Sequence, residues 1–352
     1  MTKRPAITER SLATTERPAM TQRWELLRAL GAVADSPAAA RTVSGSLGLA
    51  AVSDAEHTEA FVLNCPPYAA VYLGPDGALG GEGADRAAGF WRALGLTPPT
   101  EPDHLTALLA LYAQLGEAAA DSGRPATARA LTQARLSLFR EHLWPWLPAY
   151  LDAVADLGLP VLTGWAGLTR RAVSAEVAGQ PAWPALPLAL RAAPDLPLAS
   201  DLALAPAQPL APRTASDLPL ASPAARTDPV VGLAALVGLL TTPVRSGIIV
   251  TRRQLAAGAG EAGLGHRIGE RRFALRALFS QDPEATVAWT AAEAARWQDR
   301  HLRRAAGDDV AGWWAERAAR TGALLREHRA RLNADAAGVR CQAPPARAPG
   351  LI

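Results

Sequence analysis

The chain has 352 residues, of which 49% are hydrophobic, and a formal net charge of +3. Its two cysteines, Cys65 and Cys341, stand far apart, which excludes a disulfide framework and a four-cysteine metal site. So small a positive surplus does not require a nucleic acid or a membrane as partner. No apolar stretch reaches the roughly 20 residues of a membrane span, and no apolar core follows Lys3 and Arg4. We therefore expect no stable membrane insertion, no secretory signal and a cytoplasmic location.

The first half of the chain is predicted to be helical. Residues 1–21 are polar, contain Pro5 and Pro18, and are expected to form a disordered arm. Apolar residues then recur every three or four positions, which indicates amphipathic helices, and strand signals are nearly absent. These patterns predict an all-α core over residues 22–180, with helices starting near Trp24 and spanning about 54–63, 84–94, 105–115, 131–142 and 151–157.

The composition changes between residues 181 and 229, where Ala, Leu and Pro dominate. Proline at this density interrupts helices and removes sheet donors, so we predict a flexible low-complexity linker, partly polyproline II. Within it the hexapeptide Asp195-Leu196-Pro197-Leu198-Ala199-Ser200 recurs as Asp217-Leu218-Pro219-Leu220-Ala221-Ser222. The repeat is either a ligand for a partner or the result of slippage during duplication.

A second helical module is predicted over residues 230–333, followed by a disordered tail over 334–352. Thr251 and Gln254 fit a capping box, and Asp282 before Pro283 fits an N-cap with proline in the first helical position. One face of a long terminal helix is predicted to carry Val310, Trp314, Arg317, Thr321, Leu325, His328 and Leu332.

The run Glu101-Pro102-Asp103-His104-Leu105 can be interpreted in two ways. As local structure it is an ordinary helix start, with Pro102 at the first position and Asp103 near the positive end of the helix dipole. As a binding site it places carboxylates and a histidine in front of the apolar helix face that begins at Leu105. Carboxylates beside an apolar groove suit a peptide that carries paired guanidinium groups and then a hydrophobic segment.

Three motifs together resemble the TorD/DmsD/NarJ family of molybdoenzyme-specific (redox enzyme maturation) chaperones. They are Pro66-Pro67-Tyr68 through Tyr72-Leu73, the run Glu101 to Leu105, and Phe139 through His142-Leu143 to Trp146. The family's usual signature has one residue between Pro and Asp that this chain lacks. The resemblance covers roughly residues 23–165 and implies an all-helical chaperone core that catalyses no reaction.

The resemblance also implies a partner and a site. The partner is a molybdoenzyme precursor, bound through its twin-arginine signal peptide and assisted during cofactor insertion before export; a homodimer is possible. The expected binding residues are Tyr68, Tyr72, Glu101, Asp103, His104, Leu105, Leu108, Tyr112, His142 and Trp146. Because an exposed ion pair contributes only about 0–1 kcal/mol, the groove should supply most of the affinity. Tyr72→Ala is therefore predicted to weaken peptide binding more than Glu101→Ala.

Other site types have weaker signals. Glu101, Asp103, His104 and His142 could form a metal site only if their helices pack together, and no H-E-x-x-H pair exists, so we expect no metal and no other cofactor. The glycines from Gly258 to Gly263 follow no clear strand and are a poor nucleotide motif. The arginine-rich segment 251–279 is compatible with a helix-turn-helix, which leaves a nucleic-acid-binding regulator as the alternative function, although we expect no nucleic acid partner.

Overall fold

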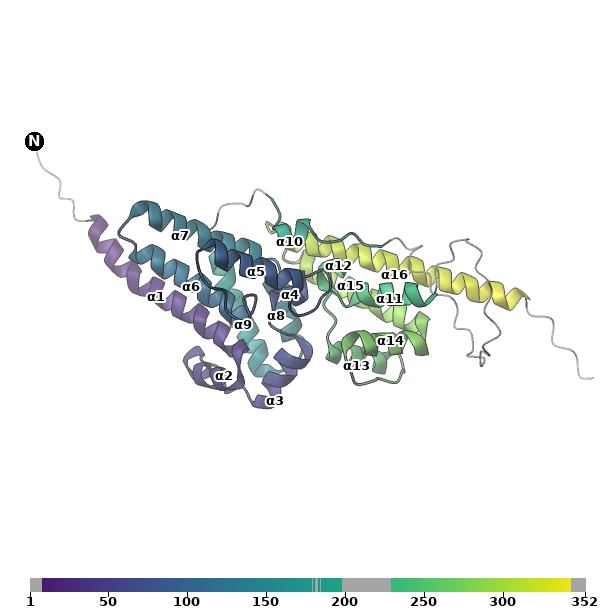
Figure 1. Cartoon of the computed structure of the whole chain (residues 1–352). Helices are drawn as coiled ribbons and strands as arrows, with labels where there is room; N and C mark the ends of the chain where they lie inside the picture. Colours follow the sequence, from purple (N-terminus) through teal and green to yellow (C-terminus); the bar gives the residue numbers. More distant parts are fainter. Residues whose placement is uncertain (1–7, 179, 181–182, 184, 198–228, 343–352) are drawn as a thin grey trace, which may run out of the picture. The chain divides into compact units, whose positions relative to one another are not determined.

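The computed structural model describes residues 8–178, 180, 183, 185–197 and 229–342. The all-α prediction is confirmed, because these residues form helices and no strand; a single isolated bridge pairs Tyr68 with His104. The chain divides into two compact units, residues 1–193 and 194–352, coloured purple to teal and green to yellow (Figure 1). Each unit is described separately below.

Unit 1 is a helical bundle in which α1, α6 and α7 lie side by side (Figure 1), while α8 packs on α9. Two of its elements, η2 and η3, are π-helical, and η1 is a 3₁₀ turn. The elements are α1 (Thr8–Asp35), α2 (Pro37–Ser44), η1 (Gly45–Leu47), α3 (Asp54–His57), η2 (Thr58–Asn64), α4 (Ala69–Leu73), α5 (Gly81–Ala93), α6 (Leu105–Asp121), α7 (Pro125–Leu138), η3 (Phe139–Leu143), α8 (Leu147–Ala155), α9 (Pro160–Ala178) and α10 (Leu188–Arg191).

Small residues allow α1 and α6 to approach closely. A Cβ atom on Gly116 of α6 would lie 2.6 Å from the ring of Trp24 on α1, so only glycine leaves room for the indole. The Thr106 hydroxyl donates to the Gly31 carbonyl across the same interface at 2.8 Å. Trp165 of α9 joins from the other side, donating from Nε1 to the Leu30 carbonyl at 2.9 Å. The core of unit 1 is therefore assembled around α1.

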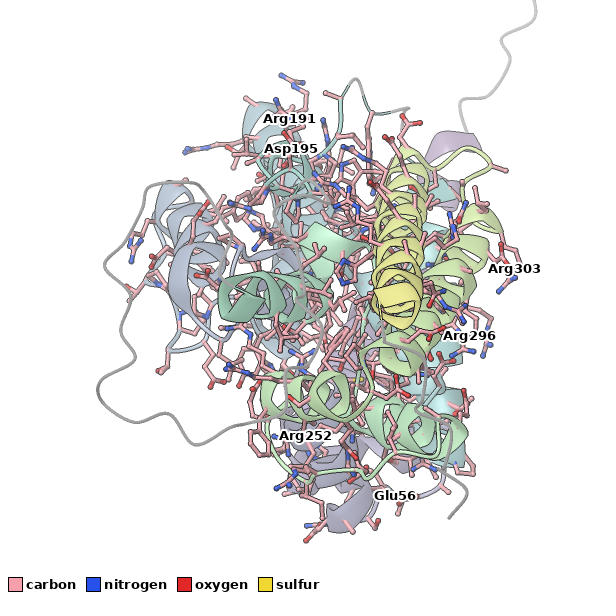
Figure 2. All side chains as sticks on the ribbon, turned by 90° about the vertical axis from the view of Figure 1, so that its right-hand side faces the viewer. Glu56, Arg191, Asp195, Arg252, Arg296 and Arg303 are labelled. Atoms are coloured by element: carbon pink, nitrogen blue, oxygen red, sulfur yellow. The ribbon has the colours of Figure 1, made fainter. Side chains whose placement is uncertain are left out.

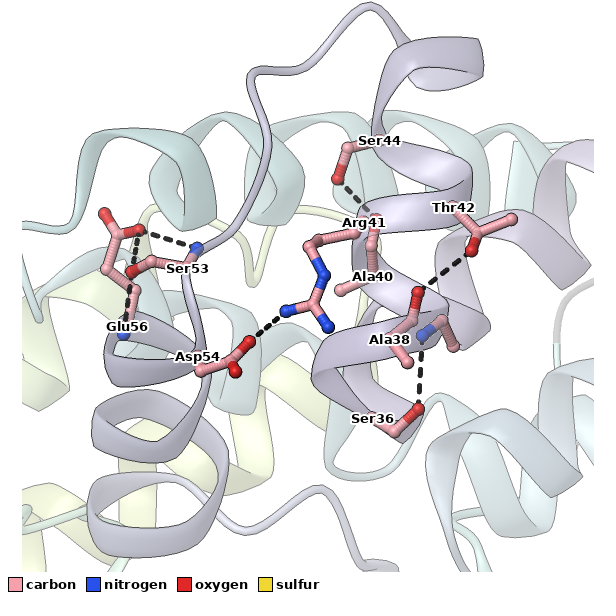
Figure 3. A network of polar contacts seen from close by, with 10 residues as sticks. Ser36, Ala38, Ala40, Arg41, Thr42, Ser44, Ser53, Asp54 and Glu56 are labelled. Atoms are coloured by element: carbon pink, nitrogen blue, oxygen red, sulfur yellow. Dashed lines mark hydrogen bonds and ion pairs between the residues drawn. The ribbon is translucent and has the colours of Figure 1, made fainter.

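Local capping sets the start of α2 and α3 (Figure 3). Ser36 accepts a hydrogen bond from the Ala39 N–H at 3.2 Å, and Ser53 and Glu56 form a reciprocal capping box. An ion pair between Arg41 and Asp54 then joins the two helices (Figure 3). These contacts position the chain that leads through η2 to the Pro66-Pro67 break.

The first helix begins earlier than expected. We predicted a disordered arm over residues 1–21 and a helix from Trp24, but α1 already includes residues 8–21; residues 1–7 lie outside the described part. Helix propagation from a packed segment costs far less than nucleation. The packed half of α1 can therefore carry the helix outward through Pro18, which we had taken as a break.

Unit 2 is built on the helical hairpin of α15 and α16, with α14 packed on α15, α12 on α16, and α11 and α13 on α14. Both predicted caps are confirmed: Thr251 and Gln254 form the capping box of α13, and Asp282 caps α15 ahead of Pro283. Arg252, Arg296 and Arg303 of this unit carry side chains that project from the ribbon (Figure 2). The helices are α11 (Pro229–Leu240), α12 (Pro243–Ser246), α13 (Arg252–Glu261), α14 (Arg271–Gln281), α15 (Pro283–Leu302) and α16 (Asp309–Gln342).

Three boundaries differ from the predictions. The expected linker contains α10, the predicted tail contains the end of α16, and the units meet at residue 193; the rest of the linker (198–228) and tail (343–352) lies outside the described residues. The helix-turn-helix interpretation fails on geometry, since nine residues, 262–270, separate α13 from α14. A DNA-binding motif of this kind uses a turn of about three or four residues.

Candidate functional site

The site is built where the start of α4 meets the start of α6. Tyr68 is the N-cap of α4 and His104 the N-cap of α6. Their backbones pair in antiparallel fashion: the Ala69 N–H donates to the Asp103 carbonyl at 3.0 Å, and the Leu105 N–H donates to the Pro67 carbonyl at 2.8 Å. This pairing brings two motifs together that are more than thirty residues apart in the chain.

Asp103 holds the two helix starts together. Its Oδ2 accepts a hydrogen bond from the Ala70 N–H at 2.9 Å, so it caps the free N–H groups of α4 rather than those of its own helix. The residue is only 2% exposed. Burial raises the pKa of the carboxyl, and the Ala70 hydrogen bond opposes that rise. Asp103 is thus a structural residue of the site, not one that a ligand can reach.

His104 is also held internally. Its Nδ1 accepts a hydrogen bond from the Thr106 N–H at 3.2 Å, so the neutral ring carries its proton on Nε2. Burial lowers the pKa of the ring, although the carboxylates of Glu101, Asp35 and Asp103 act in the opposite direction. The ring packs edge-to-face against Tyr68, with 4.7 Å between centroids.

Tyr68 and Glu101 form the exposed part of the site. The Tyr68 hydroxyl donates to Glu101 Oε1 at 2.9 Å, and Glu101 is exposed to solvent. Burial, followed by the hydrogen bond to Glu101, raises the pKa of Tyr68 to about 12, so the phenol stays protonated and remains a donor. Because Glu101 is exposed and a carboxylate accepts several hydrogen bonds, its second oxygen can accept hydrogen bonds from a ligand.

A further carboxylate, Asp35, belongs to the same place and was missed by sequence reasoning. It is the last residue of α1, it is exposed, and its charge raises the pKa of both Tyr68 and His104. Neither Asp35 nor Glu101 forms an ion pair with any residue that the structure describes. An acid at a helix C-terminus opposes the helix dipole. Asp35, Tyr68 and Glu101 are called the acidic rim below; its two carboxylates, Asp35 and Glu101, carry negative charge without a cation among the described residues.

The aromatic residues expected to line a groove are packed in the core instead. Tyr72 is 1% and Trp146 0% exposed, and their rings stack at 5.2 Å with Tyr150 against both. The Trp146 Nε1–H donates to the His142 carbonyl at 2.8 Å. His142 itself is buried against Phe90. The expectation that Tyr72 faces a ligand is not met in this structure, because its ring is surrounded by protein.

The remaining predicted residues also point inward. Leu105 and Leu108 are fully buried on the inner face of α6. Tyr112 donates from its hydroxyl to Glu176 Oε2 at 2.6 Å and packs edge-to-face on Trp24. This hydrogen bond ties α6 to α9, so Tyr112 stabilises the bundle away from the acidic rim.

Two exposed apolar residues precede the site in the chain. Val62 is 62% and Leu63 37% exposed at the end of η2, whereas Phe61 beside them is buried against Trp165. The sequence predicted one helix over 54–63 and gave these residues no separate role. The π-helical continuation of that helix turns Val62 and Leu63 outward, a change that helical periodicity does not reveal.

Two general classes of site find no support in the described residues. They contain no group of three or more His, Cys, Asp or Glu side chains arranged to hold a metal ion. Among the same residues, no helix combines the length and apolar character that a bilayer crossing demands.

Comparison with known proteins finds a family that matches part of the chain. Residues 28–152 match the family model described as nitrate reductase delta subunit. No curated protein and no solved structure matches the chain. The matched segment contains the whole acidic rim together with Val62 and Leu63, and it ends before α9.

Proposed function

We propose that this protein binds the twin-arginine signal peptide of a molybdoenzyme precursor in the cytoplasm. The premise is that residues 28–152 belong to the nitrate reductase delta subunit family, a family of molybdoenzyme maturation chaperones. The membership agrees with the resemblance to TorD/DmsD/NarJ chaperones found in the sequence. In this proposal the chaperone holds the precursor until its cofactor is inserted, and it catalyses no reaction.

The observation that carries the proposal is the uncompensated charge of the acidic rim. Asp35 and Glu101 are exposed and form no ion pair with a described residue, and the Tyr68 hydroxyl donates a hydrogen bond to Glu101. The charge of each acid raises the pKa of Tyr68. Two guanidinium groups present planar donors that match carboxylates of this kind. The rim would therefore orient the arginine pair of the peptide.

Affinity has to come chiefly from apolar contact. A micromolar complex needs about 8 kcal/mol, whereas exposed ion pairs contribute about 0–1 kcal/mol each. Burying a Val- or Leu-sized side chain contributes about 1.5–3 kcal/mol before the costs of association. Val62 and Leu63 are exposed side chains of this kind close to Tyr68 in the chain, so we assign the apolar segment of the signal peptide to them.

The test is a titration of the full chain with a fluorescein-labelled peptide that carries two consecutive arginines before an apolar segment. The double variant Val62→Ser/Leu63→Ser should weaken binding about tenfold or more, since it removes two apolar contacts. Glu101→Gln should weaken binding up to about fivefold and flatten its salt dependence. Glu82→Gln is the matched control, because Glu82 is an exposed acid of the same unit paired with Arg86.

A peptide with two lysines in place of the arginines distinguishes specific binding of the guanidinium groups from general attraction between opposite charges. It should bind more weakly to the wild type, and the difference should shrink in Glu101→Gln. Equal binding of both peptides to every variant, with Glu82→Gln as damaging as Glu101→Gln, would remove the acidic rim from the proposal.

A further inference from the structure

Unit 2 has an open depression of about 450 Å³ at its surface, lined by Arg267, Phe273, Arg276, Ala277, Ser280 and Gln281. Gln281 fixes the wall formed by residues 262–270, because its side-chain amide accepts from the Gly265 N–H and donates to the Gly265 carbonyl, both at 2.8 Å. Phe273 lies over Gly269, where an added Cβ would sit 2.9 Å from the ring. The depression is therefore a fixed feature of the α14 region.

The depression combines positive charge with exposed apolar surface. Phe273 is 53% exposed, and Ile268 in the adjoining wall is 91% exposed. Neither Arg267 nor Arg276 forms an ion pair or hydrogen bond through its side chain with a described residue. Glu270, which lies between them in the chain, uses its carboxylate to cap α14. Such a surface suits a segment in which an acid adjoins apolar residues.

The residue just before the first copy of the duplicated hexapeptide contacts an arginine that lies beside an aromatic ring in this unit. Arg317 donates from Nη1 to the Pro194 carbonyl at 2.6 Å, and its guanidinium lies 4.9 Å from the centre of the Trp313 ring. The charge of Asp195, the first residue of that copy, raises the pKa of Arg317, although burial, the larger effect, lowers it. Figure 2 labels Asp195.

The geometry points to the second copy, Asp217-Leu218-Pro219-Leu220-Ala221-Ser222, as the occupant of the depression, with Asp217 paired to Arg267 or Arg276 and the leucines packed on Phe273. An arginine near an aromatic ring occurs at both places, and the two hexapeptides are identical. We expect an arginine and the Phe273 ring to hold the second copy.

The chain length permits this contact. Six residues lie between Ser222 and Pro229, so that the distance between them can reach up to about 23 Å. Pro229 begins α11, which packs on α14, and Arg272 at the start of α14 donates to the Thr241 hydroxyl at 3.3 Å just beyond α11. A short tether gives a millimolar effective concentration, so even a millimolar affinity keeps about half of the molecules docked.

Hydrogen exchange measured by mass spectrometry on the full chain tests the proposal. Amides within 217–222 should exchange about two- to tenfold more slowly than in the double variant Arg267→Glu/Arg276→Glu. Asp217→Arg should abolish the protection, and combining it with the double variant should restore it. Asp195→Arg is the matched control at the first copy and should leave 217–222 unchanged. Unchanged exchange of α14 in each variant shows that the unit remains folded.

Two results overturn the proposal. One is exchange at 217–222 that does not respond to Arg267→Glu/Arg276→Glu. The other is protection that disappears on dilution, which would make a second copy of the chain the occupant; protection independent of concentration supports docking within one chain.

Discussion

The acidic rim and the aromatic core beneath it share one stretch of chain but serve different purposes. Tyr68 and Tyr72 are four residues apart, yet the Tyr68 hydroxyl donates to an exposed carboxylate, while the Tyr72 ring stacks on Trp146 and meets Tyr150 edge-to-face. Two tyrosines of the same motif therefore have different roles. Chemistry available to a partner lies at the rim, and stability lies in the core.

The comparison predicts its largest effect for the core. Trp146→Ala removes a fully buried ring and should lower the free energy of unfolding by about 3–5 kcal/mol. Tyr68→Ala should cost far less stability, since the ring is only half-buried. Urea denaturation of both variants measures the difference. Equal losses would show that the rim is as much a part of the core as Trp146.

Tyr72→Ala belongs with the core variants. We expected from sequence that it would weaken peptide binding more than Glu101→Ala, but its burial makes lost packing the first consequence. Peptide titration of the folded fraction separates the two effects. A stably folded Tyr72→Ala protein that no longer binds the peptide would return Tyr72 to the binding site.

The next effect in size is expected from low pH, which should lower the stability of unit 1. Burial lowers the pKa of His142 to about 4, against about 6.5 when unfolded. The unfolded state therefore binds a proton first as the pH falls, and stability is lost between about pH 6.5 and 4, at up to about 1.4 kcal/mol per pH unit. Unfolding followed at pH 7 and 5 measures this loss. His142→Leu should show a shallower dependence on pH in unit 1.

His301 provides the same test in unit 2. Burial lowers its pKa to about 3, helped by the charge of Arg304, while the ring hydrogen-bonds to the Gly247 carbonyl at 3.1 Å. Unit 2 should thus lose stability over a slightly wider range, from about pH 6.5 down to 3. His142→Leu should leave this second dependence intact.

Substitutions at two helical glycines should change stability less, and they separate the effect of close packing from that of helix propensity. Gly116→Ala should destabilise unit 1 by about 1–3 kcal/mol, because the methyl group would meet Trp24. Gly89→Ala meets no atom within 4 Å and should stabilise α5 by about 0.5–1 kcal/mol. Thermal melts of the two variants should shift in opposite directions; shifts of the same sign would contradict the packing argument.

The smallest expected effect lies at the rim. Glu101→Gln leaves the fold intact and should change peptide affinity by no more than about 1 kcal/mol, with the change vanishing at high salt. Fluorescence anisotropy at low and high ionic strength measures it. A loss that persists in high salt would indicate a buried ion pair rather than an exposed rim.

Periodicity and capping chemistry were enough to predict the helical class, the capping box of α13, the N-cap of α15 and the inward face of α16, whose predicted residues from Val310 to His328 are buried. These features depend on contacts within four residues, which the sequence contains directly. The early start of α1 and the late end of α16 were missed because helix propagation depends on the packing of the rest of the helix.

The acidic rim is a different kind of feature. Glu101 and Tyr68 stood in motifs that the sequence singled out, but Asp103, which joins those motifs, caps a helix that begins 34 residues earlier in the chain, and Asp35 belongs to α1. Which tyrosine is exposed, and which carboxylates lack a cation, follows from how distant segments pack. Neighbouring residues in the sequence determined the helices and their caps. The tertiary structure decided which side chains are exposed and which charges are paired, because solvent access depends on how distant segments pack.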